Sequence, residues 1–178
     1  MRRVHLDEWS ALAGDTLHRL RLNSPADGWF PALQDLSWCI AKSDPFHIDI
    51  FFSPHLKKVS VYLSWSWRDS EVPHDSDILP AVASIISLLP TSTLQSLLVG
   101  GGQRKMPWGY LKDSLSSIVL RCGPSLIEFS STIQLSDAAA NYLIHLPHLR
   151  IWRVEGPPPT YSASPLPSVF PPLTELTL

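Results

Sequence analysis

A run of glycines followed by two cations is the first feature with the potential for chemistry. The segment GGGQRK extends from Gly100 to Lys105, and glycine-rich loops of this kind can hold a phosphate through their backbone amides. The segment lacks the G-x-x-x-x-G-K-[ST] spacing that aims those amides and a lysine at the phosphate. A flexible turn is therefore the better interpretation, in which the glycines let the chain reverse its direction.

Histidines near other possible ligands are the second such feature. His145 and His148 are three positions apart, but a metal site needs further ligands with defined geometry. Cys39 and Cys122 do not lie at ligand spacing from this pair. We expect His145 at a helix end, where an imidazolium interacts favourably with the helix dipole, and His148 in a loop. The sequence predicts no metal site.

A third group, His74 with Asp75 and Asp77, lies in a segment that also contains serine and proline. An Asx-type turn explains it better than a catalytic group does. The chain has neither a G-x-S-x-G nucleophile motif nor an H-E-x-x-H motif. We therefore expect no catalytic and no cofactor-binding residue, and no enzyme. A small hydrolase is kept only as an alternative.

The composition predicts one folded domain over residues 1–178. Hydrophobic residues make up 44% of the chain and charged residues 17%, which argues against disorder. The net charge of −2 implies no general attraction to nucleic acid or to an anionic membrane, and no apolar run approaches the roughly 18–20 residues that span a bilayer. Two cysteines cannot staple a domain of this size, which favours a reduced compartment, cytoplasmic or nuclear.

A repeated segment predicts the elements that would position any site. The segment reads Leu-x-x-Φ-x-Φ, where Φ is mostly apolar, and we call its first residue the head leucine. Recurring short strands of this kind are typical of solenoids, and the roughly 20–29 residue period of leucine-rich repeats matches three of the steps between head leucines, which are 23, 23 and 24 residues. The seven segments are LHRLRL (17–22), LQDLSW (33–38), LKKVSV (56–61), LQSLLV (94–99), LIEFSS (126–131), LRIWRV (149–154) and LTELTL (173–178).

The segments between these strands predict helices. Apolar residues recur at helical spacing in 77–90, in 110–124 and in 135–147, with Ser136 or Asp137 as the N-cap of the third. A weaker helix is expected over 6–13, and long loops over 63–77 and 156–172, the second because of its many prolines. The predicted fold is α/β: a leucine-rich-repeat-like, right-handed solenoid with parallel strands on one face and helices or loops on the other. The predicted inward helix positions are Ile78, Leu79, Val82, Ile85, Ile86, Leu89, Leu111, Leu115, Ile118, Val119, Cys122, Leu135, Ala138 or Ala139, Tyr142, Leu143 and Leu146.

Side chains between the motif positions are expected to point away from the helices, because side chains alternate along a strand. These residues carry both charge signs, hydroxyls and a few apolar groups, which favours protein recognition. Tyrosine and arginine are frequent anchors in such surfaces. The first candidates for protein binding are Arg19, Arg21, Lys58, Tyr62, Leu98 and Arg153.

Tryptophans offer a second kind of candidate. Trp65 and Trp67 share parity with Val59 and Val61, so a prolonged third strand would point them into the core; the alternative is an aromatic binding anchor at the edge of the following loop. Trp108 and Trp152 are expected in the core.

Three segments together resemble a known family: CGPSLIEFS (122–130), FFSPHLKKVSVYLS (51–64) and the stretch from LPHLRIWRV to PPLTELTL (146–178). They are similar to the irregular leucine-rich-repeat region of fungal, mainly basidiomycete, F-box-type proteins, from about Leu17 onward. The resemblance implies a region that selects proteins for ubiquitination, while an N-terminal F-box binds a Skp1-like adaptor of a cullin ligase. An F-box itself is absent before Leu17, and the consensus asparagine is missing after most strands.

The expected function is a non-enzymatic protein–protein interaction scaffold, similar to the substrate-recognition repeat region of an F-box ubiquitin-ligase subunit. The expected partner is a protein of unknown identity, with a Skp1-like adaptor only if a longer chain supplies an F-box. An alternative is a truncated, unstable remnant of a larger protein, because LTELTL ends the sequence without a polar capping segment.

Overall fold

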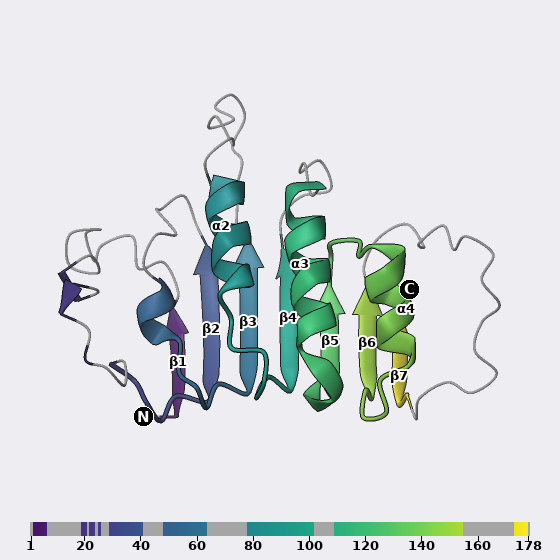
Figure 1. Cartoon of the computed structure of the whole chain (residues 1–178), viewed down its shortest axis with the longest axis horizontal. Coiled ribbons are helices and arrows are strands. Elements are labelled where there is room, and N and C mark those ends of the chain that lie inside the picture. Colours follow the sequence, from purple (N-terminus) through teal and green to yellow (C-terminus); the bar gives the residue numbers. More distant parts are fainter. Residues whose placement is uncertain are drawn as a thin grey trace.

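One parallel sheet of seven strands forms the framework of the computed structural model (Figure 1). The strands lie side by side in the order of the chain, and every neighbouring pair is parallel. The structure describes residues 2–6, 19, 20, 22, 23, 25, 29–40, 48–63, 78–101, 109–154 and 173–177. The strands are β1 (Arg3–Leu6), β2 (Asp35–Ile40), β3 (Lys58–Leu63), β4 (Ser96–Gly101), β5 (Glu128–Ser131), β6 (Ile151–Val154) and β7 (Glu175–Thr177).

Six of the seven predicted repeat segments form strands in a common register. Each of these strands begins two residues after its head leucine, as Glu128 does after Leu126. The first Φ residues are direct partners across the sheet, so that Leu97 pairs with Phe129 and Phe129 with Trp152. A one-residue slip would turn every such side chain to the opposite face. The shared pattern therefore fixes the register. The head leucines Leu33, Leu56, Leu94, Leu126 and Leu149 are all fully buried.

The prediction of the first strand is wrong. The described residues of this segment, Arg19, Leu20 and Leu22, are helical and do not join the sheet, and the backbone amide of Asn23 donates to the Arg19 carbonyl at 3.2 Å. The strand next to β2 is β1, whose buried Val4 pairs with Leu36. The short β1 has the alternation of a half-buried strand, but no head leucine, so the motif did not identify it. Of the weak helix expected over 6–13, Leu6 belongs to β1 and the rest lies outside the described residues.

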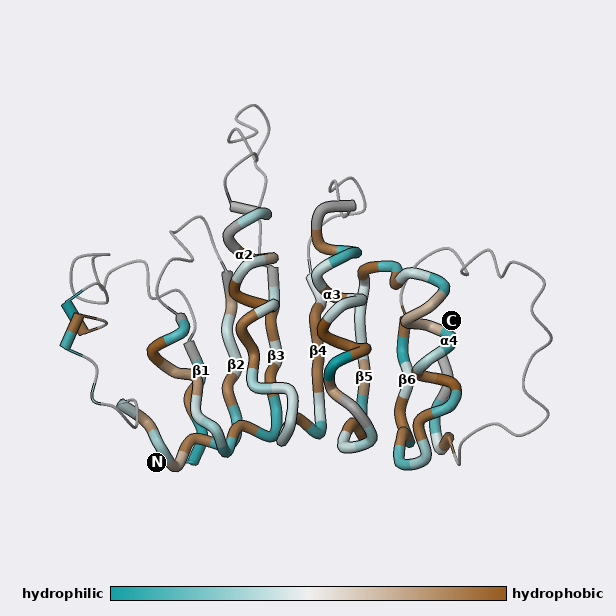
Figure 2. Tube along the Cα trace, viewed as in Figure 1, coloured by the Kyte–Doolittle hydropathy of each residue, from teal (hydrophilic) through white to brown (hydrophobic). Residues whose placement is uncertain are grey.

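Helices cover one face of the sheet (Figure 1). The predicted inward residues of the second helix are buried among the strands, including Leu111, Leu115 and Ile118. Figure 2 shows apolar residues in these helices and, along the strands, apolar residues alternating with polar ones. In the described residues no helix has the length and apolar character needed to cross a membrane. Apart from the helical residues at 19, 20 and 22, the helices in the described residues are α2 (Ile78–Ser87), α3 (Gly109–Arg121) and α4 (Asp137–Ile144), with 3-10 turns η2 (Ile48–Phe51) and η3 (Gly123–Ser125).

The beginning of α4 resolves two alternatives that the sequence left open. Ser136 is the N-cap, because its side chain accepts a hydrogen bond from the Ala139 amide at 3.3 Å, and such a cap satisfies one of the free amides of the first turn. The Ser136 amide itself donates to Ser116 Oγ on α3 at 2.8 Å. This fixes the rotation of α4 so that Ala139 is buried and Ala138 is exposed.

Hydroxyl side chains directly before the head leucines link successive units. Thr93, which precedes head leucine Leu94, donates from Oγ1 to the Leu56 carbonyl at 2.8 Å. Ser125, which precedes Leu126, donates to the Leu94 carbonyl at 3.0 Å. These bonds satisfy carbonyls at the turns into the strands, where the sheet ladder has not yet begun. The units of β3, β4 and β5 are thereby linked at the starts of their strands as well as within the sheet.

Candidate interaction surface

The sheet face opposite the helices, which we call the open face, carries four of the six sequence-predicted site residues. No described helix lies on this side (Figure 1). Because the strands are in register, the side chains form rows that run across the sheet. The first row is Arg3, Asp35, Lys58, Ser96, Glu128, Ile151 and Glu175; the second is His5, Ser37, Ser60, Leu98, Ser130 and Arg153; the third is Cys39, Tyr62 and Gly100.

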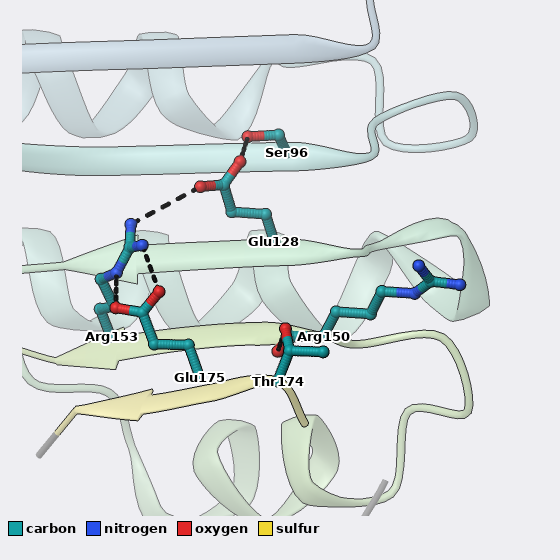
Figure 3. Close-up of polar contacts among 6 residues, drawn as sticks. All are labelled: Ser96, Glu128, Arg150, Arg153, Thr174 and Glu175. Atoms are coloured by element: carbon teal, nitrogen blue, oxygen red, sulfur yellow. Dashed lines mark hydrogen bonds and ion pairs between the residues drawn. The ribbon is translucent and has the colours of Figure 1, made fainter. Parts of the chain in front are cut away.

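An ion-pair network occupies the β4–β7 half of the open face (Figure 3). Arg153 donates from Nε and Nη2 to the two carboxylate oxygens of Glu175, both at 2.5 Å. Its Nη1 lies 3.8 Å from Glu128 Oε1, and Ser96 Oγ donates to Glu128 Oε2 at 2.7 Å. Such a two-bond contact between guanidinium and carboxylate is geometrically specific. Both carboxylates of this half are therefore already engaged within the protein.

The same contacts shift the titration of the pair. Hydrogen bonds from Arg153 hold the pKa of the Glu175 carboxyl below its ordinary value. The hydrogen bonds to Glu175 in turn raise the pKa of the Arg153 guanidinium, and the charges of Glu175 and Glu128 add to this effect. Each group favours the charged form of the other. The contact therefore favours the charged forms of both Arg153 and Glu175, and Arg153 also lies 3.8 Å from Glu128.

At the opposite edge of the sheet, Arg3 pairs with Asp35. Arg3 Nε donates to Asp35 Oδ2 at 2.7 Å, and the side chains are 78% and 18% exposed. A surface pair of this kind contributes about 0–1 kcal/mol to stability. The pair matters here because it orients the Asp35 carboxylate toward β1 and away from β3.

Lys58 lies between these two groups without an anion of its own. In register its neighbours are Asp35 on β2 and Ser96 on β4. Asp35 is bonded to Arg3 and Ser96 to Glu128. In the part of the chain that the structure describes, the exposed Lys58 ammonium makes no hydrogen bond and no ion pair. Its three donors are free to contact a ligand.

Short side chains fill the middle of the open face. Ser37 and Ser60 are direct partners on β2 and β3, and Ser130 is the partner of Leu98. Tyr62 stands beside this row and is exposed. The Ser60 residue is only 5% exposed, because its neighbours are longer. The middle of the face thus combines hydroxyl groups, the half-buried Leu98 and one aromatic ring.

Four of the six sequence-predicted binding residues come together on this face. Lys58, Tyr62, Leu98 and Arg153 lie in strands β3, β4 and β6 as expected. Arg19 does not, because it is in an exposed helical turn apart from the sheet, and Arg21 lies outside the described residues. The binding role of all six stays a prediction.

Sequence reasoning missed a further row of exposed side chains directly before the strands. Their backbones continue the ladder: the Lys57 amide donates to the Gln34 carbonyl at 2.8 Å, and the Arg150 amide to the Ile127 carbonyl at 2.8 Å. Figure 3 shows the Arg150 side chain extending away from the ion-pair network. The second motif position would have identified every member of this row except Arg2, because β1 has no head leucine. Its exposed or half-buried members are Arg2, Gln34, Lys57, Gln95, Ile127, Arg150 and Thr174.

The chemical candidates of the sequence have structural roles or lie outside the described residues. Gly100 and Gly101 end strand β4, and the rest of that glycine run is not described. His145 is the C-cap of α4, with Nδ1 2.7 Å from the Asn141 carbonyl, and His148 is exposed. In the described ranges no three His, Cys, Asp or Glu residues are grouped to hold a metal ion.

Of the cysteines and tryptophans, some are buried in the core and others lie outside the described residues. Burial raises the pKa of the Cys122 thiol to about 12, with Arg121 opposing the shift, so Cys122 is a core residue. Trp152 is buried as expected. The alternatives for Trp65 and Trp67, together with Trp108 and the group His74, Asp75 and Asp77, lie outside the described residues.

Comparisons with known proteins add no relative. No protein-family profile matches the chain. No curated protein and no solved structure is significantly similar to it.

Proposed function

We propose that this protein is a non-enzymatic protein–protein interaction scaffold with the architecture of a leucine-rich-repeat-like, right-handed solenoid. The observation that carries the proposal is the open face itself: in-register rows of side chains across seven strands. Six spacings of about 4.8 Å give a width of about 29 Å. A width of this order suits contact with another protein, whose interfaces bury about 800 Å² per partner.

The composition of the open face supports protein binding. Its middle combines Tyr62 and Leu98 with serine hydroxyls, and its ends carry charged side chains. Protein interfaces have this arrangement, with an aromatic or apolar centre surrounded by polar groups. The described helices of three connections, α2, α3 and α4, lie on the other side of the sheet and leave this face uncovered (Figure 1).

The resemblance to the repeat region of F-box-type proteins narrows the proposal. In that setting the scaffold would select a protein for ubiquitination, and a Skp1-like adaptor would bind an F-box of a longer chain. Proximity labelling in the native host with the longest form of the protein tests this part. Failure to label any Skp1-like or cullin protein would remove the ligase role and leave the scaffold role standing.

Site-specific photo-cross-linking tests the scaffold role itself. A photoreactive phenylalanine analogue replaces Leu98 on the open face in one variant and Lys112 on α3 in a matched control. After irradiation in host cells, Leu98 is expected to yield at least about fivefold more adducts with other proteins, because interface residues are found at a contiguous patch rather than uniformly. Equal yields from the two layers would contradict the proposal.

A further inference from the structure

Charge is unevenly distributed along the open face and the row directly before it. At the β1–β3 end, Arg2 and Lys57 precede Arg3 and Lys58, and all four cations are exposed. The backbone places them close together: the Gln34 amide donates to the Arg2 carbonyl at 3.0 Å, and the Lys57 amide to the Gln34 carbonyl at 2.8 Å. We call Arg2, Arg3, Lys57 and Lys58 the basic corner.

Little negative charge balances the basic corner. Asp35 is the only carboxylate that β1, β2 and β3 present on this face, and Arg3 already holds it at 2.7 Å. Asp49 belongs to η2, which lies with the helices on the other side of the sheet (Figure 1). Among the residues that the structure describes, the corner therefore has four cations against one anion, while the two glutamates of the β4–β7 half are bonded to Arg153 and Ser96.

Uncharged side chains continue from the basic corner along β3. Tyr62 is four residues beyond Lys58 on the same strand face, a distance of about 13 Å for an extended chain. Ser60 lies between them, and Leu98 is the neighbour of Ser60 on β4. An extended peptide above β3 would cover the same distance in four residues. One end of it would meet cations, and the other would meet an aromatic ring and an aliphatic side chain.

From this arrangement we propose that the β1–β4 half of the open face binds an extended acidic segment of another protein. Two or three carboxylates of that segment meet Lys58 and Arg3 on the open face and Lys57 directly before β3, and an apolar residue about four positions away packs on Tyr62 and Leu98. The inference rests on the proposed scaffold function and specifies the chemistry of the partner. Charge complementarity supplies the selectivity and steering, and the apolar contact adds buried area.

A protein segment fits this surface better than a nucleic acid does. The basic corner extends across three strands, about 10 Å between the outer two, whereas nucleic-acid binding uses cations that follow a phosphate backbone over a longer track. The chain as a whole has a net charge of −2, which repels a polyanion at long range. A short acidic segment experiences mainly the local field of the corner, because screening limits the range to about 8–10 Å.

Fluorescence anisotropy with the full chain tests the inference. The acidic probe is a labelled peptide with three glutamates, a Ser-Gly-Ser spacer, phenylalanine and leucine; the control probe has lysines in place of the glutamates. We expect the acidic probe to bind at least about tenfold more tightly, and binding to weaken with salt because exposed charges are screened. Equal affinity for the two probes would overturn the proposal. So would tighter binding of a single-stranded oligonucleotide of similar length.

Two substitutions of the same type locate the contact. Lys58→Glu is expected to weaken the acidic probe about tenfold or more, because it reverses the unpaired charge at the centre of the corner. Lys112→Glu on α3 makes the same charge change on the helix layer and should alter affinity less than about twofold. Lys58→Gln, which removes the charge without reversing it, provides an intermediate loss. Circular dichroism melts verify that all three variants are folded. Equal losses for Lys58→Glu and Lys112→Glu would refute the site.

Cross-linking from Leu98 separates this inference from the scaffold proposal. If Leu98 captures a protein whose cross-linked segment is acidic, and Lys58→Glu abolishes the capture, both proposals are supported. If the captured segment is not acidic and Lys58→Glu leaves the yield unchanged, the acidic-segment inference fails while the scaffold role stands. If Leu98 captures no more protein than Lys112 does, the scaffold role fails, and the inference that rests on it fails with it.

Discussion

Replacing Leu126 by alanine tests whether the head leucines hold the sheet and the helices together. Leu126 is fully buried, as are the head leucines Leu94 and Leu149 of the two adjacent strands. The substitution removes three carbon atoms, which corresponds to about 2.4 kcal/mol at about 0.8 kcal/mol for each buried carbon group. The residual cavity adds to this loss, and the total expected is about 3–4 kcal/mol, within the range of about 2–5 kcal/mol for such truncations.

Urea unfolding of the full chain, followed by far-UV circular dichroism, measures the loss. Leu88→Ala is the matched control, because Leu88 is 61% exposed at the end of the α2 region and its truncation should cost less than about 0.5 kcal/mol. Leu126→Met keeps most of the volume and should cost about 1 kcal/mol. This variant keeps the test decisive if the alanine variant does not fold.

The expected order of destabilisation is Leu126→Ala, then Leu126→Met, then Leu88→Ala. An alanine variant at Leu126 that loses no more stability than the one at Leu88 would refute the structural reasoning. It would mean that Leu126 faces water, and that the register derived from the repeat is incorrect.

Three further predictions concern single residues. N-ethylmaleimide at about pH 8 should modify half-buried Cys39 at least about tenfold faster than Cys122. The thiolate is the reactive form, and burial raises the pKa of the Cys122 thiol to about 12. Peptide mass spectrometry measures the two rates, and equal rates would contradict the burial of Cys122. Gly101→Ala should lower the free energy of unfolding by about 1–2 kcal/mol, because the φ of Gly101 is 97°. Gly100→Ala should be neutral or slightly stabilising, since a Cβ there would meet its nearest atoms at 3.7 and 3.8 Å. Comparable losses of stability at both positions in thermal melts would argue against this backbone conformation. Ser136→Ala should lower the free energy of unfolding by about 0.5–1 kcal/mol, because it removes the N-cap of α4. Ser136→Asp should retain most of the stability, because aspartate also caps helices. Equal urea midpoints for the two variants would exclude the cap.

The repeat in the sequence predicted most of the sheet. The motif placed β2 to β7 correctly and gave Leu97, Phe129 and Trp152 equivalent positions, which are successive partners across the sheet. A period-two pattern carries this information directly, since a slip by one residue would expose every apolar side chain. The motif failed at the first strand. It assigned LHRLRL at 17–22 to the sheet, although the described residues there are helical and β1 is formed by RVHL at 3–6.

The sequence predicted which face of the sheet carries the candidate residues, but not which ion pairs they form. Alternation alone assigned Lys58, Tyr62, Leu98 and Arg153 to the open face, as the structure shows. Alternation could not indicate that Arg153 would engage Glu175 and Glu128 while Lys58 would remain unpaired. Those pairings depend on which strands are adjacent and on the direction that each long side chain takes, and neither is a property of a single segment.

The sequence by itself thus determined the unit: a head leucine, a short strand, and in three cases an apolar helix face to cover it. These features are local, because periodicity and capping act within about a dozen residues. Only the tertiary structure decided how the units are combined, with RVHL as the edge strand, Ala139 rather than Ala138 against the sheet, and four cations gathered beside one carboxylate. The physical reason is that pairing and charge balance depend on distances between residues far apart in the chain, which no local pattern contains.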